Sequence, residues 1–396
     1  MRRAMIVGAV LCAVAAAWAA DAPKDLSSIL FWTPQQQEAG YRAIENHFPT
    51  RLVKHGAGVY PLASATQAFD VAYDYQGASW NTDKFLSANR VSGLLVITDG
   101  RIVLERYALG RRESDRWISF SVSKSVTSML IGAAIRDGAI RSLDAAVTDY
   151  VPGLKGSAYE GVTLRQLLTM TSGVKWNENY ADPKSDVALF AQGAPGPDGE
   201  SPIVAYMAKL PREAPPGSKF VYKTGESDLL GIVLEHATHK HLADYLSQKI
   251  WSKFGMESDA VWMDDSGGHE IGGCCIAMTL RDYGRFGLFV MNGGMAGGEQ
   301  VVPPDYLSAA TSKQVDIGDP TAGYGYQWWT VQGGIYQALG IFGQSITVVP
   351  SEHLVIVINS AWPTAETGAL FNAEVAYMQA VGKALHTAPS SATAPP

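Results

Sequence analysis

Ser121 and Lys124 are the residues whose types and spacing best suit a chemical reaction, and they lie near the start of the stretch 117–139. They stand three residues apart, so on a helix their side chains would share one face. A largely apolar run from Val126 to Ile135 follows, and Arg136-Asp137-Gly138 carries the signals of a helix end. A serine at the start of a buried helix can act as a nucleophile when an adjacent amine removes its proton.

The Ser-x-x-Lys spacing also has a plainer explanation, because a serine at this position often caps a helix while a nearby lysine is solvated. About one such match is expected by chance in a chain of this length and ordinary composition. A second match, Ser172 and Lys175, is rejected, since Gly173 interrupts the helical turn that the geometry requires. The spacing alone therefore leaves nucleophile and cap as alternatives.

The base for such a serine would have to be a lysine, with or without a tyrosine. The chain contains no Gly-x-Ser-x-Gly segment, and none of its eight histidines lies in a stretch built to activate a serine. Tyr222 and Thr224 come in the turn before a helical pattern, where the tyrosine could face the nucleophile. Between cations the pKa of a phenol can fall, which would make Tyr222 a general base and acid. A tyrosine at the edge of the core is the alternative.

Gly343 marks a third candidate element. It enters a predicted edge strand, where the lack of a side chain lets a substrate approach the backbone closely. An N–H group there could pair with the N–H of Ser121 as an oxyanion hole. A glycine kept for turn geometry alone is the alternative.

The elements that must position these residues are strands toward both ends of the chain and helices in the middle. The run Val91–Arg106 predicts a hairpin around Asp99-Gly100. Further strands are expected at 325–331, 346–349 and 354–359, and helices near 35–47 and at 163–170, 226–254 and 279–291. The long aromatic segment Gly173–Pro216 is interpreted as a lid over the site, with a plain surface loop as the alternative.

These elements predict an α+β fold, in which a mainly antiparallel sheet is flanked by helices and carries an inserted, mainly helical region. One domain is expected over residues 21–387. Its sheet region would cover about 90–115 and 275–385, and its helical region about 116–274. Residues 388–396 contain only Ala, Pro, Ser and Thr, which is typical of a disordered tail.

The composition is that of a globular protein. The chain has 396 residues, of which 47% are hydrophobic and 17% charged, and its net charge is −7. Basic runs are absent, so we do not expect nucleic acid as a partner. The sequence does not determine the oligomeric state.

Residues 1–20 look like a secretory signal. Two arginines precede an apolar run, and Ala17-Trp18-Ala19 matches a small-x-small cleavage pattern. A membrane anchor is less favoured because the apolar run is short. We therefore expect a periplasmic or secreted protein without membrane association after signal cleavage.

Of the three cysteines, only Cys274 and Cys275 would remain after this cleavage. Two buried thiols are favoured there over a vicinal disulfide or a metal site.

Several segments, in one order and spacing, resemble the serine β-lactamase/penicillin-binding-protein superfamily. The resemblance is closest to the aminohexanoate-dimer (nylon-oligomer) hydrolases and related esterases. It covers roughly residues 90–380, and several independent blocks in one order are more specific than any single block. The blocks are Ser121–Ser125, Asp149–Tyr159, Tyr180–Pro183, Phe220–Tyr222, Gly272-Gly273 with Thr279–Asp282, Gln327–Trp329, Gly340–Gln344 and Ser360–Pro363.

The resemblance implies an acyl-enzyme mechanism without a metal or cofactor. Ser121 would be the nucleophile, and Lys124 and Tyr222 would share its proton and protonate the leaving group. The N–H groups of Ser121 and Gln344 would form the oxyanion hole. Tyr180 on the lid would hydrogen-bond an amide leaving group.

Phe342 and Thr224 depart from the family pattern. Phe342 stands where class C lactamases carry Lys-Thr-Gly, and a phenyl ring cannot hold a substrate carboxylate. Lys223-Thr224-Gly225 spells that triplet, but a helical pattern follows at once, so we do not give it that role; Thr224 replaces the usual Asn or Ser and keeps a hydroxyl. With Gly343 these residues are expected to contact a small neutral or hydrophobic ester or amide. A β-lactamase or D,D-peptidase, and a penicillin-binding sensor that acylates without turnover, are the alternatives.

Overall fold

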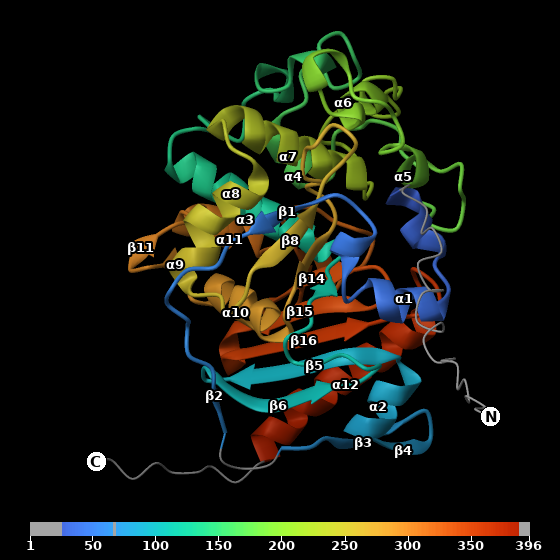
Figure 1. The fold of residues 1–396 in the computed structure, drawn as a ribbon, viewed down its shortest axis with the longest axis vertical. Helices are drawn as coiled ribbons and strands as arrows, with labels where there is room; N and C mark the ends of the chain where they lie inside the picture. Colours follow the sequence, from blue (N-terminus) through green and yellow to red (C-terminus); the bar gives the residue numbers. More distant parts are fainter. Residues whose placement is uncertain (1–25, 66–68, 388–396) are drawn as a thin grey trace, which may run out of the picture.

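An eight-stranded sheet forms the centre of the computed structural model, which describes residues 26–65 and 69–387 (Figure 1). All of its strand pairs are antiparallel except β2 with β6 at one edge. The predicted α+β class with an antiparallel sheet is confirmed. In spatial order its strands are β12 (Ala322–Tyr324), β13 (Trp329–Val331), β14 (Ile335–Gly340), β15 (Gln344–Val349), β16 (Leu354–Ser360), β5 (Val91–Thr98), β6 (Arg101–Tyr107) and β2 (Ala63–Ser64).

The predicted hairpin around Asp99-Gly100 is the connection between β5 and β6. Both turn residues have positive φ, 48° at Asp99 and 73° at Gly100, as a two-residue turn of this type requires. Strand β5 is buried on both faces, because alternate residues pack against different helices. Leu95 faces helix α10 (Leu280–Met291), while Leu94 packs in a cluster with helix α12 (Gly368–Thr387). Helix α12 was not anticipated from the sequence.

The helical region gathers over one end of the sheet, opposite β3 and β4 (Figure 1). Its central helix α3 (Val122–Arg136) is buried along nearly its whole length and packs against helix α7 (Thr224–Thr238). The buried helix predicted after Ser121 is therefore confirmed. Helix α4 (Leu164–Leu168) and helix α11 (Pro304–Ala310) cover other sides of this core.

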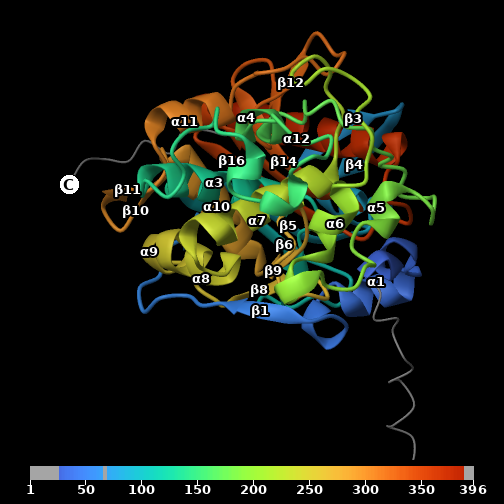
Figure 2. The ribbon, with the colours of Figure 1, turned by 90° about the horizontal axis from the view of Figure 1, so that it is seen from above.

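A second, four-stranded sheet links the two segments that carry the site. Its order is β1 (Thr50–Val53), β8 (Ala260–Met263), β9 (Ile276–Met278) and β7 (Trp117–Ile118). β1 and β8 lie on one side of the molecule, with β12 and α11 on the other (Figure 2). Because β7 pairs with β9, the residues just after β7 and just before β9 are held side by side. No sequence pattern predicted this sheet.

Three predicted elements differ from the structure. The strand expected over 325–331 is present only as β13, because residues 325–328 form the bend between β12 and β13. The helix expected over 226–254 breaks at His239, whose φ is 54°, and resumes as α8 (Leu242–Leu246), η6 (Ser247–Trp251) and α9 (Ser252–Phe254). The segment 173–216, expected to be a long loop, contains helices α5 (Asp186–Leu189), η5 (Pro197–Gly199) and α6 (Pro202–Met207).

The remaining elements are η1 (Leu26–Phe31), α1 (Pro34–Gly40), η2 (Ile44–Asn46), β3 (Ala72–Tyr75), β4 (Ala78–Asn81), α2 (Thr82–Ala88), η3 (Val147–Asp149), η4 (Pro152–Leu154), β10 (Met295–Ala296), β11 (Glu299–Gln300) and η7 (Pro350–Glu352).

Cys274 and Cys275 form a vicinal disulfide, so the preference for two thiols was wrong. Adjacent cysteines are compatible with either state, and no other residue type nearby distinguishes them.

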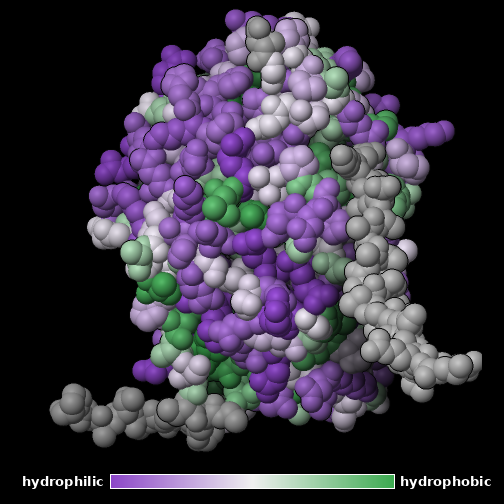
Figure 3. Space-filling model, in the orientation of Figure 1, coloured by the Kyte–Doolittle hydropathy of each residue, from purple (hydrophilic) through white to green (hydrophobic). Residues whose placement is uncertain are grey.

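Hydrophobic residues on the face seen in Figure 3 gather only in small, separate patches among hydrophilic ones. No helix within 26–65 or 69–387 is long and apolar enough to cross a membrane. The predicted signal, residues 1–20, and the predicted tail, residues 388–396, lie outside the described residues.

Candidate active site

Ser121 lies at the N-terminus of α3, but its side chain does not cap the helix. Its hydroxyl oxygen is instead 3.0 Å from the Lys124 amine nitrogen, one turn further along. The approach that the Ser-x-x-Lys spacing predicted is therefore present, and the capping alternative is not. The Ser121 side chain is mostly buried, yet it lines two separate cavities. A nucleophile needs both features, a base within hydrogen-bond distance and a cavity through which the substrate can reach it.

The Lys124 nitrogen has three hydrogen-bond partners, and their chemistry determines the orientation of the amine. Besides Ser121, the amine contacts the Gly273 carbonyl at 2.9 Å and the Thr224 hydroxyl at 3.0 Å. A carbonyl can only accept. Thr224 donates its single hydroxyl proton to Glu178, so it must accept from the amine. A neutral amine has two N–H groups and one lone pair, and these contacts leave the lone pair for the Ser121 hydroxyl.

Burial makes this neutral form accessible. Lys124 is 1% exposed, and desolvation lowers its pKa to about 8. The negative charges of Glu178 and Asp228 act in the opposite direction, but less strongly. Asp228 lies on α7, where its carboxylate accepts a 2.6 Å hydrogen bond from the Gly273 N–H. Burial raises the pKa of Asp228 to about 7, while Lys124 lowers it.

Tyr222 lies beside the same pair, with the Lys124 nitrogen 5.2 Å from the centre of its ring. Burial is the largest influence on the pKa of Tyr222 and raises it well above the ordinary value, as does the charge of Glu178. A hydrogen bond with Ser121 opposes the rise without cancelling it. The expected fall in the pKa of this phenol was wrong, because burial raises the pKa and the nearby carboxylates of Glu178, Glu366 and Asp228 raise it further. Tyr222 is thus a neutral phenol that can donate a proton.

Glu178 is a site residue that the sequence reasoning missed. Its carboxylate accepts hydrogen bonds from the Thr224 backbone N–H at 2.9 Å, the Tyr180 hydroxyl at 2.7 Å, the Thr224 hydroxyl and the indole N–H of Trp176. A carboxylate at the first turn of α7 is favoured by the positive end of the helix. Glu178 lies in the aromatic segment interpreted as a lid, so the available signal was that segment.

Two cavities meet at Ser121 and Tyr180. The first has a volume of about 60 Å³ and walls that are mainly apolar, including Leu26, Leu30 and Phe190. The second is larger, about 470 Å³, and its lining includes Tyr222 and several carboxylates. Thr224 lines the first cavity, although both of its hydroxyl contacts are with Glu178 and Lys124. We therefore regard Thr224 as positioning the amine rather than contacting substrate.

The end of β14 passes beside the backbone of Ser121. A β carbon added at Gly340 would lie 3.1 Å from the Ser121 nitrogen, and the next residue, Ile341, lines both cavities. In the described loops and turns, neither the Ser121 N–H nor the Ile341 N–H donates to a backbone carbonyl. Gln344, predicted as the second oxyanion donor, opens β15 between two hydrogen-bonded strands. Its side-chain amide is turned inward to Trp117 and Ser360.

Phe342 does not reach substrate space as predicted, whereas Gly343 does line one of the two cavities. The Phe342 ring is 1% exposed and packs against Phe120 and Tyr41, so it lines neither cavity. The substrate argument built on this ring was therefore wrong: residue 342 lies in a turn, and its side chain points to the core. Gly343 lines the second cavity in a turn before β15, which is an interior strand. The closest approach there is by Trp362, whose ring would lie 2.4 Å from a β carbon added at Gly343.

Neither rejected motif supplies a nucleophile or a base, although Thr224 of the second one contacts the Lys124 amine. Ser172 is fully buried and hydrogen-bonds Glu226, while Lys175 is exposed. The Lys223-Thr224-Gly225 triplet opens α7 instead of lying on a strand, and the Lys223 amine is paired with Glu226.

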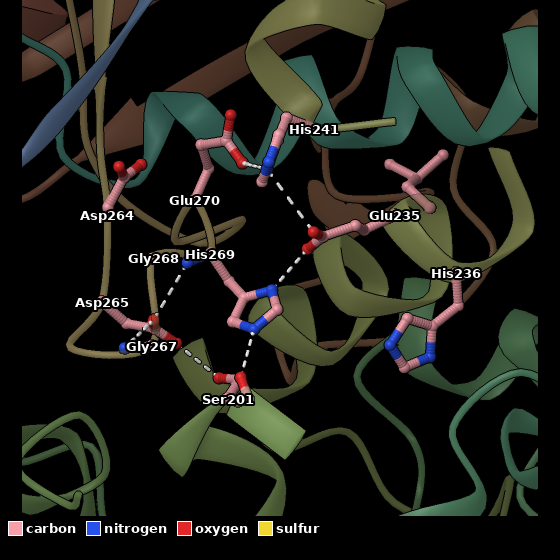
Figure 4. Close-up of polar contacts among 12 residues, drawn as sticks. Ser201, Glu235, His236, His241, Asp264, Asp265, Gly267, Gly268, His269 and Glu270 are labelled. Carbon is pink, nitrogen blue, oxygen red and sulfur yellow. Dashed lines mark hydrogen bonds and ion pairs between the residues drawn. The ribbon is translucent and has the colours of Figure 1, made fainter. Parts of the chain in front are cut away.

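The histidines form no part of the site. His269 and His241 both point to Glu235, whereas His236 points away from it (Figure 4). The Glu235 carboxylate lies 2.6 Å from the His269 ring and raises the pKa of His269 to about 9. This cluster anchors the loop that leads to Gly273. Among the described residues, no group of three or more His, Cys, Asp or Glu side chains is arranged to hold a metal ion.

The fold and this geometry define a hydrolase of the serine β-lactamase type. The chain belongs to the β-lactamase family, whose sequence model matches residues 62–376.

Individual relatives narrow the comparison. The chain is 30% identical over 288 residues to the 6-aminohexanoate-dimer hydrolase of Paenarthrobacter ureafaciens. This alignment covers 69% of the chain and 73% of that protein. A solved Bacillus anthracis structure, whose name also refers to a 6-aminohexanoate-dimer hydrolase, superposes with a TM-score of 0.75 at 25% identity, over 87% of this chain and 94% of that one. A penicillin-binding protein from Bacillus halodurans shares the fold, with a TM-score of 0.60 at 17% identity over 75% and 98%.

Proposed function

We propose that this chain is a serine hydrolase that cleaves a small ester or amide through an acyl-enzyme on Ser121. The 3.0 Å contact between the Ser121 hydroxyl and the Lys124 amine is the observation that carries the proposal. The amine lone pair takes the hydroxyl proton while the serine oxygen attacks the substrate carbonyl. The C–O or C–N bond to the leaving group then breaks, and an ester bond to Ser121 remains.

The two N–H groups of Ser121 and Ile341 supply the oxyanion hole in this proposal. Both belong to residues that line the cavities, and both lack a backbone acceptor in the described loops and turns. Donors aimed at the carbonyl oxygen stabilise the negative charge that develops on it. Ile341 replaces Gln344 in this role because the Gln344 backbone belongs to the interior of the sheet.

Tyr222 protonates the leaving group. Its phenol stays neutral because burial raises its pKa, and it lines only the larger of the two cavities. Tyr180 lines both cavities and donates its own proton to Glu178, so its oxygen can accept a hydrogen bond from an amide leaving group. Water then hydrolyses the acyl-enzyme, with Lys124 again as the base.

The location of the protein is part of the same proposal. The charged start, apolar run and Ala-Trp-Ala pattern of residues 1–20 support export to the periplasm or the medium. A cell fractionation with an N-terminal sequence of the exported form would test it.

Acylation with p-nitrophenyl butyrate tests the reaction. We expect steady turnover by the wild type, a mass increase of one butyryl group on the peptide containing Ser121, and neither in Ser121→Ala. A stoichiometric burst without turnover would favour the penicillin-binding sensor. Hydrolysis of nitrocefin faster than of simple esters would favour the β-lactamase alternative.

A further inference from the structure

The larger cavity has an unusual combination of acidic and aromatic walls. Glu178, Glu366 and Glu374 line it from three different segments of the chain. No lysine, arginine or histidine among the described residues lines either cavity. The aromatic residues that share the larger cavity are Tyr180, Tyr222, Trp329, Trp362 and Phe371.

Glu374 is the buried end of this cavity. It lies on α12 and is 2% exposed, and one of its oxygens accepts a 2.6 Å hydrogen bond from the Ser345 hydroxyl. The other oxygen, Oε2, has no hydrogen-bond partner among the described residues. Burial raises the pKa of Glu374 to about 7. A buried carboxylate without a cation is costly, and a bound positive charge would relieve that cost.

The chemistry at Ser121 assigns the two cavities to the two halves of a substrate. Tyr222, the proton donor to the leaving group, lines the larger cavity and not the smaller one. The leaving group must therefore occupy the larger cavity. The smaller cavity, with Leu26, Leu30 and Phe190 in its wall, is left for a short apolar acyl chain.

We propose that the preferred substrate joins a short apolar acyl group to a leaving group that carries an organic ammonium ion, held in the larger cavity by Glu374 and Glu366. Trp329 and Phe371 line the same cavity, and aromatic faces attract ammonium groups. This inference rests on the proposed hydrolase function of Ser121. It also predicts that a carboxylate on the leaving group is repelled, because no basic side chain of the described chain lines the cavity.

Acylation balances with the groups already named, and water is the one further reactant, because it releases the acyl group from Ser121 as a carboxylic acid in the second step. The serine oxygen forms the acyl ester, the bond to the leaving oxygen or nitrogen breaks, and that atom takes the Tyr222 proton. Lys124 returns the serine proton to Tyr222. The ammonium group keeps its charge throughout and leaves with the alcohol or amine.

Two isosteric esters provide the test: butyrylcholine, and 3,3-dimethylbutyl butyrate, in which a carbon replaces the quaternary nitrogen. We expect the wild type to show a kcat/KM for butyrylcholine roughly tenfold or more above that for the neutral ester. A ratio of one or less would overturn the inference. The monobutyryl ester of 4-hydroxybutyrate, which carries a carboxylate, should be the poorest of the three.

Variants locate the effect. Glu374→Gln and Glu366→Gln should each lower the ratio toward one, while Glu299→Gln, at an exposed carboxylate on β11, should leave it unchanged. Equal ratios in all four proteins would also overturn the assignment. Glu366 lies on the exposed rim, so its variant remains informative even where Glu374→Gln does not fold. If the folded wild type hydrolyses neither these esters nor p-nitrophenyl butyrate, the proposed function itself fails.

Discussion

The Thr224 hydroxyl oxygen lies 3.0 Å from the Lys124 amine nitrogen and donates its own proton to Glu178. Thr224 must therefore accept a hydrogen bond from the Lys124 amine. The Gly273 carbonyl accepts a second hydrogen bond from the same amine. When the amine is neutral, these two acceptors take its two N–H groups and leave its lone pair directed at Ser121. The contact assigns Thr224 a role in orienting the base.

Removing the Thr224 hydroxyl should loosen the base. In Thr224→Val one N–H of Lys124 loses its acceptor, so we expect kcat for p-nitrophenyl butyrate to fall about 10- to 100-fold with little change in KM. Thr224→Ser keeps the hydroxyl and should retain most of the activity. Steady-state kinetics of both variants check this, and equal losses in both would contradict the orienting role.

The two Ser-x-x-Lys matches should respond differently to substitution. Ser121→Ala and Lys124→Ala should each lower kcat/KM by about 10³-fold or more, because they remove the nucleophile and its base. Ser172→Ala and Lys175→Ala should leave the activity of folded protein unchanged. Ser172→Ala should still reduce the free energy of unfolding by about 1–3 kcal/mol, since the buried Glu226 loses a hydrogen-bond donor. Urea unfolding measures the second effect.

Activity should rise with pH until Lys124 is neutral. The base acts in its deprotonated form, so kcat/KM should increase as the pH approaches about 8, where burial places the pKa of Lys124. Asp228 raises that pKa through its negative charge, so Asp228→Asn should move the rising limb to lower pH. The amide oxygen can still accept from the Gly273 N–H, which limits structural change. If the rising limb of the pH profile stays at the same pH in Asp228→Asn, a group other than Lys124 controls it.

Gly343 should not tolerate a side chain. Its φ is 82°, and an added β carbon would meet the Trp362 ring at 2.4 Å. Gly333 has a similar φ of 83° but open space around it. We expect Gly333→Ala to cost about 1 kcal/mol in the free energy of unfolding from backbone strain alone, and Gly343→Ala to cost more. Thermal unfolding of the pair separates the clash from the strain.

Local sequence patterns were sufficient to predict the elements whose residues themselves favour a turn, strand or helix. The hairpin at Asp99-Gly100 and the buried helix after Ser121 follow from turn chemistry and apolar runs within a few residues. Lys124 could be paired with Ser121 because both are on one helical turn. Tyr222 was proposed from its place in the turn before a helical pattern, and the resemblance to a family implied its role, because no spacing rule bridges its distance from Ser121 along the chain. The resemblance did not predict the direction in which the pKa of Tyr222 shifts.

The tertiary structure decided everything that depends on residues distant in sequence. The pairing of β7 with β9 sets the Gly273 carbonyl against Lys124, and the aromatic segment before α5 brings Glu178 to the start of α7. The side-chain direction of Phe342 and the interior position of β15 depend on a turn whose register the sequence leaves open. Sequence determines local conformation because the interactions involved span one or two turns. The charge around Ser121 and the lining of its two cavities depend on which segments pack together, and that is a property of the whole fold.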